Sequence, residues 1–239
     1  MKNSIRNYLM DHPPAAEIFK KLELAGNVIL IGGVLREFLD HRKIQNLRDI
    51  DIIVDVKSES QWSRVIEEYS LRTNRFGGHK IFCEGLLVDV WRIEQTWAFR
   101  EKIISCSPKD YIKLLPDTVF LNLDSIIYDW TNEKWYKEKY LEGMHSRVID
   151  VVLDKNPYIL LNITRAYVLK DRYDMSFSPK LSHLIIEEGK KYSSRESFVE
   201  AILSEQEKRY HRVIFSKDRL LGEISLLSKY ENCNNKLNT

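Results

Sequence analysis

The sequence predicts an α+β protein in which a mixed sheet flanked by helices is followed by a small all-helical part. Between Asn27 and Trp91, branched apolar runs alternate with helical patterns and end in a hairpin signal. Beyond Pro157, apolar residues recur at the three- and four-residue spacing of amphipathic helices. We therefore expect one domain at residues 1–155 and a second, helical domain at residues 156–239.

Each expected element follows from its local pattern. In the first domain we expect a helix at 15–24, a strand at 27–31, a helix at 34–39, a strand at 48–54, a helix at 59–69 and two strands at 80–83 and 86–91. Glu84-Gly85 between the last two strands is a hairpin signal. Further on we expect a helix at 109–115, strand-like pieces at 118–123, 125–129 and 148–152, and helical stretches at 158–172, 179–187 and 194–229.

The composition is that of an ordinary folded chain, with 44% hydrophobic and 30% charged residues among 239. The longest apolar stretch, Val28 to Leu35, is too short to span a bilayer, and the first residues lack the apolar core of a secretory signal. Cys83, Cys106 and Cys233 are odd in number and widely spaced, which suits a reducing compartment. We expect a cytoplasmic protein without a membrane partner.

Charge placement leaves two interpretations open. The formal net charge of +2 is close to neutral, so the field of the whole protein would not concentrate nucleic acid. Basic residues crowd the last third of the chain, but glutamates are interleaved with them. A solvated helix face and a polynucleotide track both agree with such mixed-sign helices.

Two acids in one strand form the first chemical motif, Asp49-Ile50-Asp51. Side chains alternate across a strand, so both carboxylates project from one face while Ile50 points into the core. Two neighbouring carboxylates repel each other, and a divalent cation with hard oxygen ligands removes that conflict. A strand with a charged outer face explains the same pair without a metal.

A strand that runs through Gly32 and Gly33 into a helix is the second motif. Glycines let the backbone approach a ligand, and a helix amino terminus offers free amide hydrogens to a phosphate. A tight turn would use the same glycines. Arg36, one turn into the helix, could reach a phosphate or pair with Asp40 or Asp51.

Asp89 supplies the third motif because it lies in the middle of the apolar run Leu86–Trp91. A carboxylate at such a position is costly unless it is paired or bound to a metal. The hairpin that precedes it could bring Asp89 close to Asp49 and Asp51, although an edge strand with one solvated face would also hold an acid there.

Together these motifs resemble the head domain of the tRNA nucleotidyltransferase and bacterial poly(A) polymerase family. The joint pattern, in order and at suitable spacing, is more specific than any of its pieces. The matching segments are Gly32-Gly33-x-x-Arg36, Arg48-Asp49-Ile50-Asp51, Arg75-Phe76-Gly77-Gly78, Val88-Asp89-Val90, Thr118 to Tyr128 with Asn122 as the matching asparagine, and Arg165-Ala166-Tyr167 through Tyr173 at the start of the family's helical neck.

The resemblance implies a polymerase-beta-like head in which three carboxylates hold two Mg²⁺ ions, with Mn²⁺ as a substitute. Asp49 and Asp51 would hold the metal bound to the triphosphate and share the second, and Asp89 would complete the second site. Such ions align the acceptor oxygen, lower its pKa and neutralise charge on pyrophosphate. The nucleotide-binding residues carried over by position are Gly32, Gly33, Arg36, Arg48, Asn122, Asn162 and Arg165.

The neck departs from the family at the residues that select the base. Family members that complete the tRNA terminus carry Glu-Asp-x-x-Arg there, whereas this chain places Asn162 at the position of the arginine, with no preceding acid at the right distance. Asparagine lacks the fixed donor fork of arginine, which argues against programmed C-then-A selection. The family's Asp-Phe-Thr is also altered, to Thr118-Val119-Phe120.

The sequence thus predicts an enzyme, a metal-dependent nucleotidyltransferase that uses an NTP, ATP or CTP before others, and releases pyrophosphate. An RNA 3′ end, tRNA among the candidates, is the favoured acceptor. Few residues follow the neck-like segment, so either the acceptor is small, or a homodimer or a protein partner supplies further grip on RNA, or the neck helices grip it weakly. Alternatives are transfer to a small molecule, nucleotide or protein, and a non-catalytic nucleotide- or RNA-binding protein.

Overall fold

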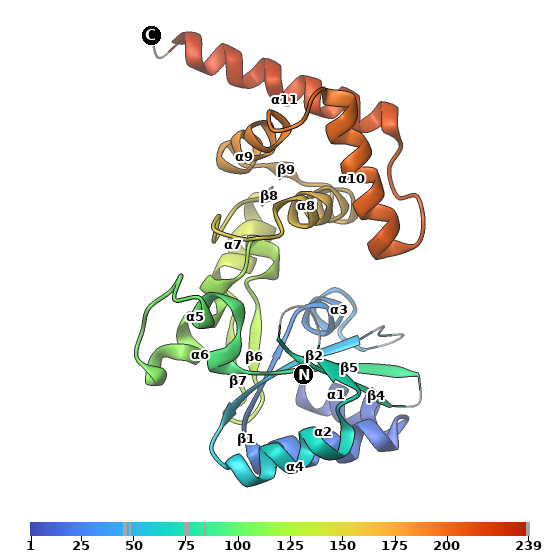
Figure 1. Ribbon diagram of the computed structural model, residues 1–239, viewed down its shortest axis with the longest axis vertical. Helices are drawn as coiled ribbons and strands as arrows, with labels where there is room; N and C mark the ends of the chain where they lie inside the picture. Colours follow the sequence, from blue (N-terminus) through green and yellow to red (C-terminus); the bar gives the residue numbers. More distant parts are fainter. Residues whose placement is uncertain (45–46, 48, 74–76, 84, 238–239) are drawn as a thin grey trace. The chain divides into compact units, whose positions relative to one another are not determined.

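In the computed structural model, a seven-stranded mixed sheet organises the first part of the chain (Figure 1). The structure describes residues 1–44, 47, 49–73, 77–83 and 85–237. In spatial order the strands are β3 (Arg72–Thr73), β4 (His79–Cys83), β5 (Leu86–Arg92), β2 (Asp49–Val56), β1 (Gly26–Ile31), β6 (Ile127–Asp129) and β7 (Lys134–Tyr136). Among these strands β2 and β5 pair parallel, and the other neighbours pair antiparallel.

Close contacts divide the chain into two units, each described here by itself. The head unit comprises Met1–Val119 and Asp124–Lys139, and the helical unit comprises Phe120–Leu123 and Tyr140–Thr239. Helices of the head unit are α1 (Lys2–Met10), α2 (Pro13–Ala25), α3 (Gly33–His41), α4 (Glu59–Tyr69) and the short α5 (Trp97–Arg100) and α6 (Tyr111–Leu114). The expected boundary at residues 155 and 156 stays a prediction.

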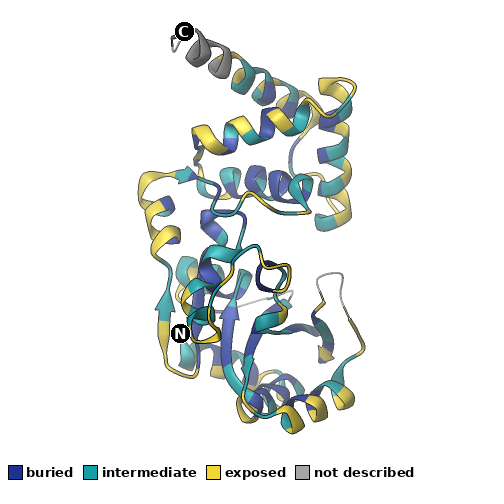
Figure 2. Ribbon diagram, turned by 60° about the vertical axis from the view of Figure 1, so that its left-hand side comes forward, coloured by how far each residue is buried: buried dark blue, intermediate teal, exposed yellow. Residues whose placement is uncertain are grey.

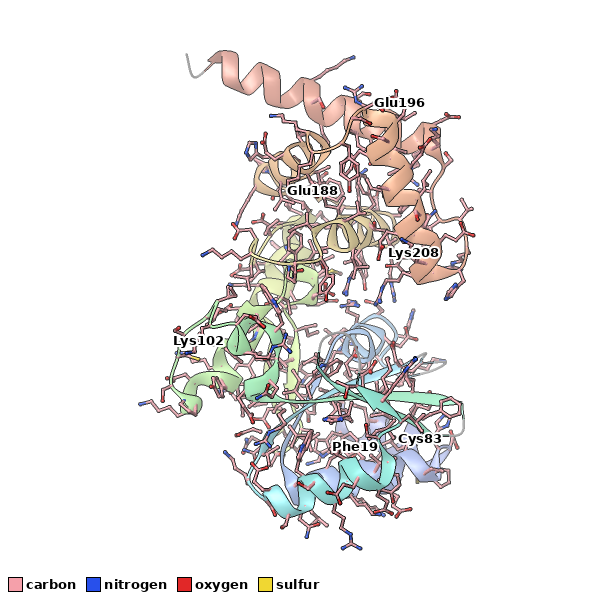
Figure 3. The ribbon with its side chains drawn as sticks, in the orientation of Figure 1. Phe19, Cys83, Lys102, Glu188, Glu196 and Lys208 are labelled. Carbon is pink, nitrogen blue, oxygen red and sulfur yellow. The ribbon has the colours of Figure 1, made fainter. Side chains whose placement is uncertain are left out.

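Helices α2 and α4 pack on each other and against one face of the sheet, which we call the inner face. Phe19 of α2 is 3% exposed and lies over the sheet, as Figure 3 shows together with Cys83 of β4. Trp62 of α4 meets His79 of β4 edge to face, at 5.9 Å between ring centroids. Burial lowers the pKa of the His79 imidazole, because the charged form loses hydration there.

The opposite, outer face is covered over part of its area by residues 93–118. This segment contains α5, α6 and short 3-10 helices, and it packs its own Phe99 and Leu115 against Ile29, Ile53 and Ile127 of the sheet. The result is a second hydrophobic core beneath the sheet's outer face. Figure 2 shows buried residues along the central strands.

Five helices and a two-stranded parallel sheet make up the helical unit as described. They are α7 (Glu138–Ser146), α8 (Ile159–Tyr173), α9 (Pro179–Gly189), α10 (Arg195–Tyr210) and α11 (Lys217–Leu237), with β8 (Val148–Ile149) and β9 (Ser176–Phe177). Helix α8 contacts α9 and α10, and its Tyr167 packs on Phe177 and Phe215. Within the described residues, none of the helices combines the length and apolarity that crossing a bilayer requires.

The predicted fold class is confirmed, including the order strand, helix, strand, helix and hairpin. Three local predictions were wrong. Residues 118–123 form a turn with a single antiparallel bridge, Leu121 to Val151, because their backbone pairs with residues 150–152. The expected helical stretch 194–229 is divided at His211, whose φ of 52° ends α10. Strand β9 also lies in the part expected to be wholly helical.

Candidate active site

Strand register arranges the outer-face residues in rows, of which three concern the site. The row across Ile53 is apolar over β1, β2 and β5, because Ile53 pairs with Ile29 of β1 and Trp91 of β5. The next row is charged and reads Ile31, Asp51, Asp89, Lys80 and Arg72 from β1 to β3. The third row reads Asp49, Leu87 and Phe82. Successive rows lie two residues apart along each strand, so all three project from the same face.

Asp51 and Asp89 are direct neighbours on the parallel strands β2 and β5. Paired strands lie about 4.8 Å apart, and Asp49 follows about 6.6 Å along β2, so the three carboxylates share one small area of the sheet. Asp49 and Asp51 are half-buried, whereas Asp89 is only 6% exposed. This juxtaposition is what the catalytic hypothesis required.

Lys80 of β4 is bound to Asp89. Its ammonium donates a hydrogen bond of 2.9 Å to Asp89 Oδ2, and the two side chains are 22% and 9% exposed. The pair compensates a carboxylate that would otherwise be costly to hold in an apolar strand. Among the described residues, no three or more His, Cys, Asp or Glu side chains are gathered closely enough to hold a metal ion as they stand. The three acid positions nevertheless supply the oxygen donors that Mg²⁺ prefers.

Gly32 stands at the end of β1, beside the acids, as the N-cap of α3. Its φ of 74° is one that side-chain-bearing residues rarely adopt, and a Cβ there would lie 2.8 Å from Asp51 Oδ2. A Cβ at Gly33 would meet nothing within 4 Å. The glycines thus differ: Gly32 permits the close approach to Asp51, and Gly33 keeps the first turn of α3 open.

Arg36 forms an ion pair with Asp124, an acid that the sequence analysis did not consider as its partner. Its Nη1 donates a hydrogen bond of 2.6 Å to Asp124 Oδ1, and the side chains are 13% and 11% exposed. The contact ties α3 to residue 124 within the head unit. An Arg36 contact with phosphate stays a prediction, as does one from Arg48, which lies outside the described residues together with Arg75 and Phe76.

The Asn122 side chain forms hydrogen bonds with backbone groups of the helical unit. Its amide donates to the Val148 carbonyl at 2.9 Å, and its carbonyl accepts from the Asp150 backbone N–H at 3.1 Å. The residue is 7% exposed, and a Cβ at Gly143 would lie 2.4 Å from its amide nitrogen. Both ends of the Asn122 side chain are therefore used in fixing the segment around β8.

Asn162 and Arg165 both lie on α8. The Asn162 amide donates to the Tyr158 carbonyl at 3.0 Å, and the residue is 8% exposed. The side chain thus serves the first turn of its own helix. Arg165 is half-buried. Nucleotide contact by these residues stays a prediction.

The sequence analysis considered Lys80 only for its charge and did not predict its contact with Asp89. The signal was available in the hairpin, in which Cys83 lies opposite Leu86. Counting outward from that pair places Lys80 opposite Asp89.

The mixed charges of the last third form ion pairs along the helices. Lys190 pairs with Glu187 three residues earlier, and Lys217 pairs with Glu200. Figure 3 shows Glu196 and Lys208 on the surface of α10, and both are exposed. These contacts favour the solvated-face interpretation over a continuous basic track.

No protein-family model and no curated protein matches the chain. Solved structures do. A CCA-adding enzyme in complex with ATP matches at a TM-score of 0.61, with 16% identity over 94% of this chain and 53% of that one. The Thermotoga maritima CCA-adding enzyme with tRNA-CCA matches at 0.57, with 15% identity over 89% and 51%. A tRNA-processing enzyme with CTP matches at 0.53, with 18% identity over 84% and 56%.

These matches define a tRNA nucleotidyltransferase-like fold, as the resemblance in sequence implied. In particular, the chain has the fold seen in CCA-adding enzymes. It spans about half the length of the solved structures it matches.

Proposed function

We propose that the protein is a nucleotidyltransferase that moves a nucleoside monophosphate from an NTP to an acceptor hydroxyl and releases pyrophosphate. The observation that carries this proposal is the charged row, in which Asp51 and Asp89 are neighbours on parallel strands and Asp49 lies two residues away on the same face. The likeness in fold to CCA-adding enzymes supports the same chemistry.

Asp49, Asp51 and Asp89 would hold divalent cations, Mg²⁺ or Mn²⁺, since carboxylates are the donors these ions prefer. When bound, the cations would lower the pKa of the acceptor hydroxyl and neutralise charge on the departing pyrophosphate. The protein's own contribution is to hold three carboxylates at fixed positions on a rigid sheet, where their mutual repulsion favours a cation between them.

The triphosphate would lie at Gly32 and the start of α3. The N-cap residue of this helix is Gly32, which has no side chain to cap the first turn, and the residues of that turn include no acid, so the positive end of the helix dipole is available at the end of β1. Gly32 brings that turn beside Asp51. A phosphate held by these amides would therefore lie beside Asp51.

An RNA 3′ end is the acceptor that we favour, because the similar structures include a CCA-adding enzyme bound to tRNA-CCA and others bound to ATP and CTP. The base would not be selected by Asn162 as the family's arginine selects it, since the Asn162 amide is bonded to its own helix. We expect a broader choice of NTP than strict C-then-A addition.

The test is transfer of label from each of the four NTPs, with Mg²⁺ or Mn²⁺, to total RNA, to small-molecule extracts and to protein. Asp51→Asn removes a charge needed in the transition state, and metal-ion stabilisation of several kcal/mol corresponds to a loss on the order of 10³-fold in rate. Asp55→Asn is the matched control, because Asp55 lies on the same face of β2 but is bonded to Asn27 and Lys57.

Labelled RNA that depends on Asp51 and tolerates Asp55→Asn supports transfer to RNA. Label in the small-molecule or protein fraction alone keeps the chemistry and changes the acceptor. If no fraction gains label under any of these conditions, the proposed activity is wrong, and a non-catalytic nucleotide-binding role takes its place.

A further inference from the structure

Asp89 and Lys80 form an ion pair in which the two side chains differ in exposure and in conformational flexibility. Asp89 is 6% exposed and lies in the middle of β5, so its short side chain extends from a backbone that is held in the sheet. Lys80 is the more exposed partner, at 22% of its side chain, and its ammonium stands on a flexible four-carbon stem. If the pair separates, the lysine is the partner that leaves.

The ammonium also contacts the carboxylate that a divalent cation would need. A cation held by Asp51 and Asp89 would bind the Asp89 carboxylate, and the Lys80 ammonium is already 2.9 Å from one oxygen of that carboxylate. Two positive charges held by the same carboxylate repel each other. Cation and ammonium therefore compete for the same carboxylate.

In the metal-free protein, Lys80 compensates the negative charge of Asp89. Asp51 and Asp89 are like charges in register on neighbouring strands, and Asp89 is buried. One lysine contact neutralises the buried member until a cation arrives. A carboxylate paired in this way binds the cation more weakly than a carboxylate left without its lysine would.

We propose that Lys80 is a built-in competitor of the divalent cation at Asp89, holding the carboxylate in the metal-free protein and leaving it when the cation binds. This inference rests on the proposed function, because it takes the three acids to be cation ligands. It predicts that Lys80 sets the cation affinity of the site, so that the site fills only at higher cation concentrations than the acids alone would need.

The test is Mn²⁺ titration of the nucleotide-free full chain, with free Mn²⁺ followed by electron paramagnetic resonance. Lys80→Met removes the competing charge and keeps an unbranched side chain, so we expect Mn²⁺ to bind about tenfold more tightly or better. Lys80→Arg keeps the charge and grips a carboxylate with two donors, so its Mn²⁺ affinity should not exceed that of the unmodified protein.

Two further variants identify the site. Lys57→Met removes another lysine–aspartate pair of the head unit, Lys57 with Asp55 at 2.8 Å, and should leave the affinity unchanged. Lys80→Met combined with Asp89→Asn should lose the gain, because the competed carboxylate is gone. Circular dichroism of each variant establishes that the fold is retained.

Equal or weaker Mn²⁺ binding by a folded Lys80→Met variant overturns the proposal, as does tighter binding by Lys80→Arg or an absence of Mn²⁺ binding by every variant. The readout is binding and not turnover. Failure of the labelling experiment therefore rejects the proposed transfer reaction while leaving this competition to be judged on its own result.

Discussion

Two neighbouring regions of the sheet's outer face, the apolar row across Ile53 and the charged row across Asp51, differ sharply in burial. Ile53 and Asp51 are two residues apart on one strand and project from the same face. Ile53 is 2% exposed beneath residues 93–118, whereas Asp51 is half-buried and lies beside a glycine turn. One strand therefore contributes to a hydrophobic core at one end and to a charged site at the other.

This contrast teaches that the covering segment defines the site as much as the acids do. Where residues 93–118 pack on the sheet, the face is apolar and closed. In the third row, beyond the charged one, Phe82 is 59% exposed. The part of the sheet that residues 93–118 cover holds the strands in place. The uncovered part of the same strands must hold three like charges.

The largest expected effect comes from breaking the covered half with Ile53→Ala. Removing a buried branched side chain leaves a cavity among Ile29, Phe99 and Leu115, so the free energy of unfolding should fall by about 3 kcal/mol. Urea denaturation measures the change. Ile53→Val is the graded control, with an expected loss of about 1 kcal/mol; a loss in the alanine variant no larger than this would show that the segment does not pack tightly on the sheet.

Substitution of two adjacent glycines tests how closely the turn at the end of β1 approaches the charged row. Gly32→Ala places a side chain at a φ of 74° and pushes it toward Asp51, so we expect a loss of about 1–2 kcal/mol in stability. Gly33→Ala meets open space and should change stability by less than about 0.5 kcal/mol. Denaturation curves of the two variants test this; equal losses would mean that Gly32 is not held against Asp51 as described.

The smallest effect is expected at the open end. Phe82→Ala removes a large apolar side chain from the same face as Ile53, but one that already faces solvent, so stability should change by less than about 0.5 kcal/mol. Thermal unfolding beside Ile53→Ala gives the direct contrast. A loss near that of Ile53→Ala would show that the third row is covered as well.

Local rules were sufficient for the fold class, for the shared face of Asp49 and Asp51, and for the position of Asp89 within its own hairpin. The alternation of Asp49-Ile50-Asp51 predicts a shared face, and the two-residue hairpin predicts where Asp89 falls in its strand. What it could not supply is the order of strands. Parallel pairing of β2 with β5 joins segments separated by α4, and no local pattern specifies the register of that contact.

The sequence also could not predict which partners the polar side chains of the site contact. Asn122 and Arg36 match family positions by residue type, yet Asn122 bonds the backbone at Val148 and Asp150, and Arg36 bonds Asp124. Such partners lie far along the chain, so the choice between a ligand and a structural contact depends on packing that sequence spacing does not encode. Lys80 is the opposite case, because its partner lies within the same hairpin.

That locality bears on how the protein folds. Lys80 and Asp89 are nine positions apart and face each other across a hairpin, so they can meet as soon as the hairpin closes, before the distant strand β2 arrives. The incoming strand then adds its two carboxylates beside an acid that is already neutralised. The sheet can therefore assemble with the buried member of the three acids already paired.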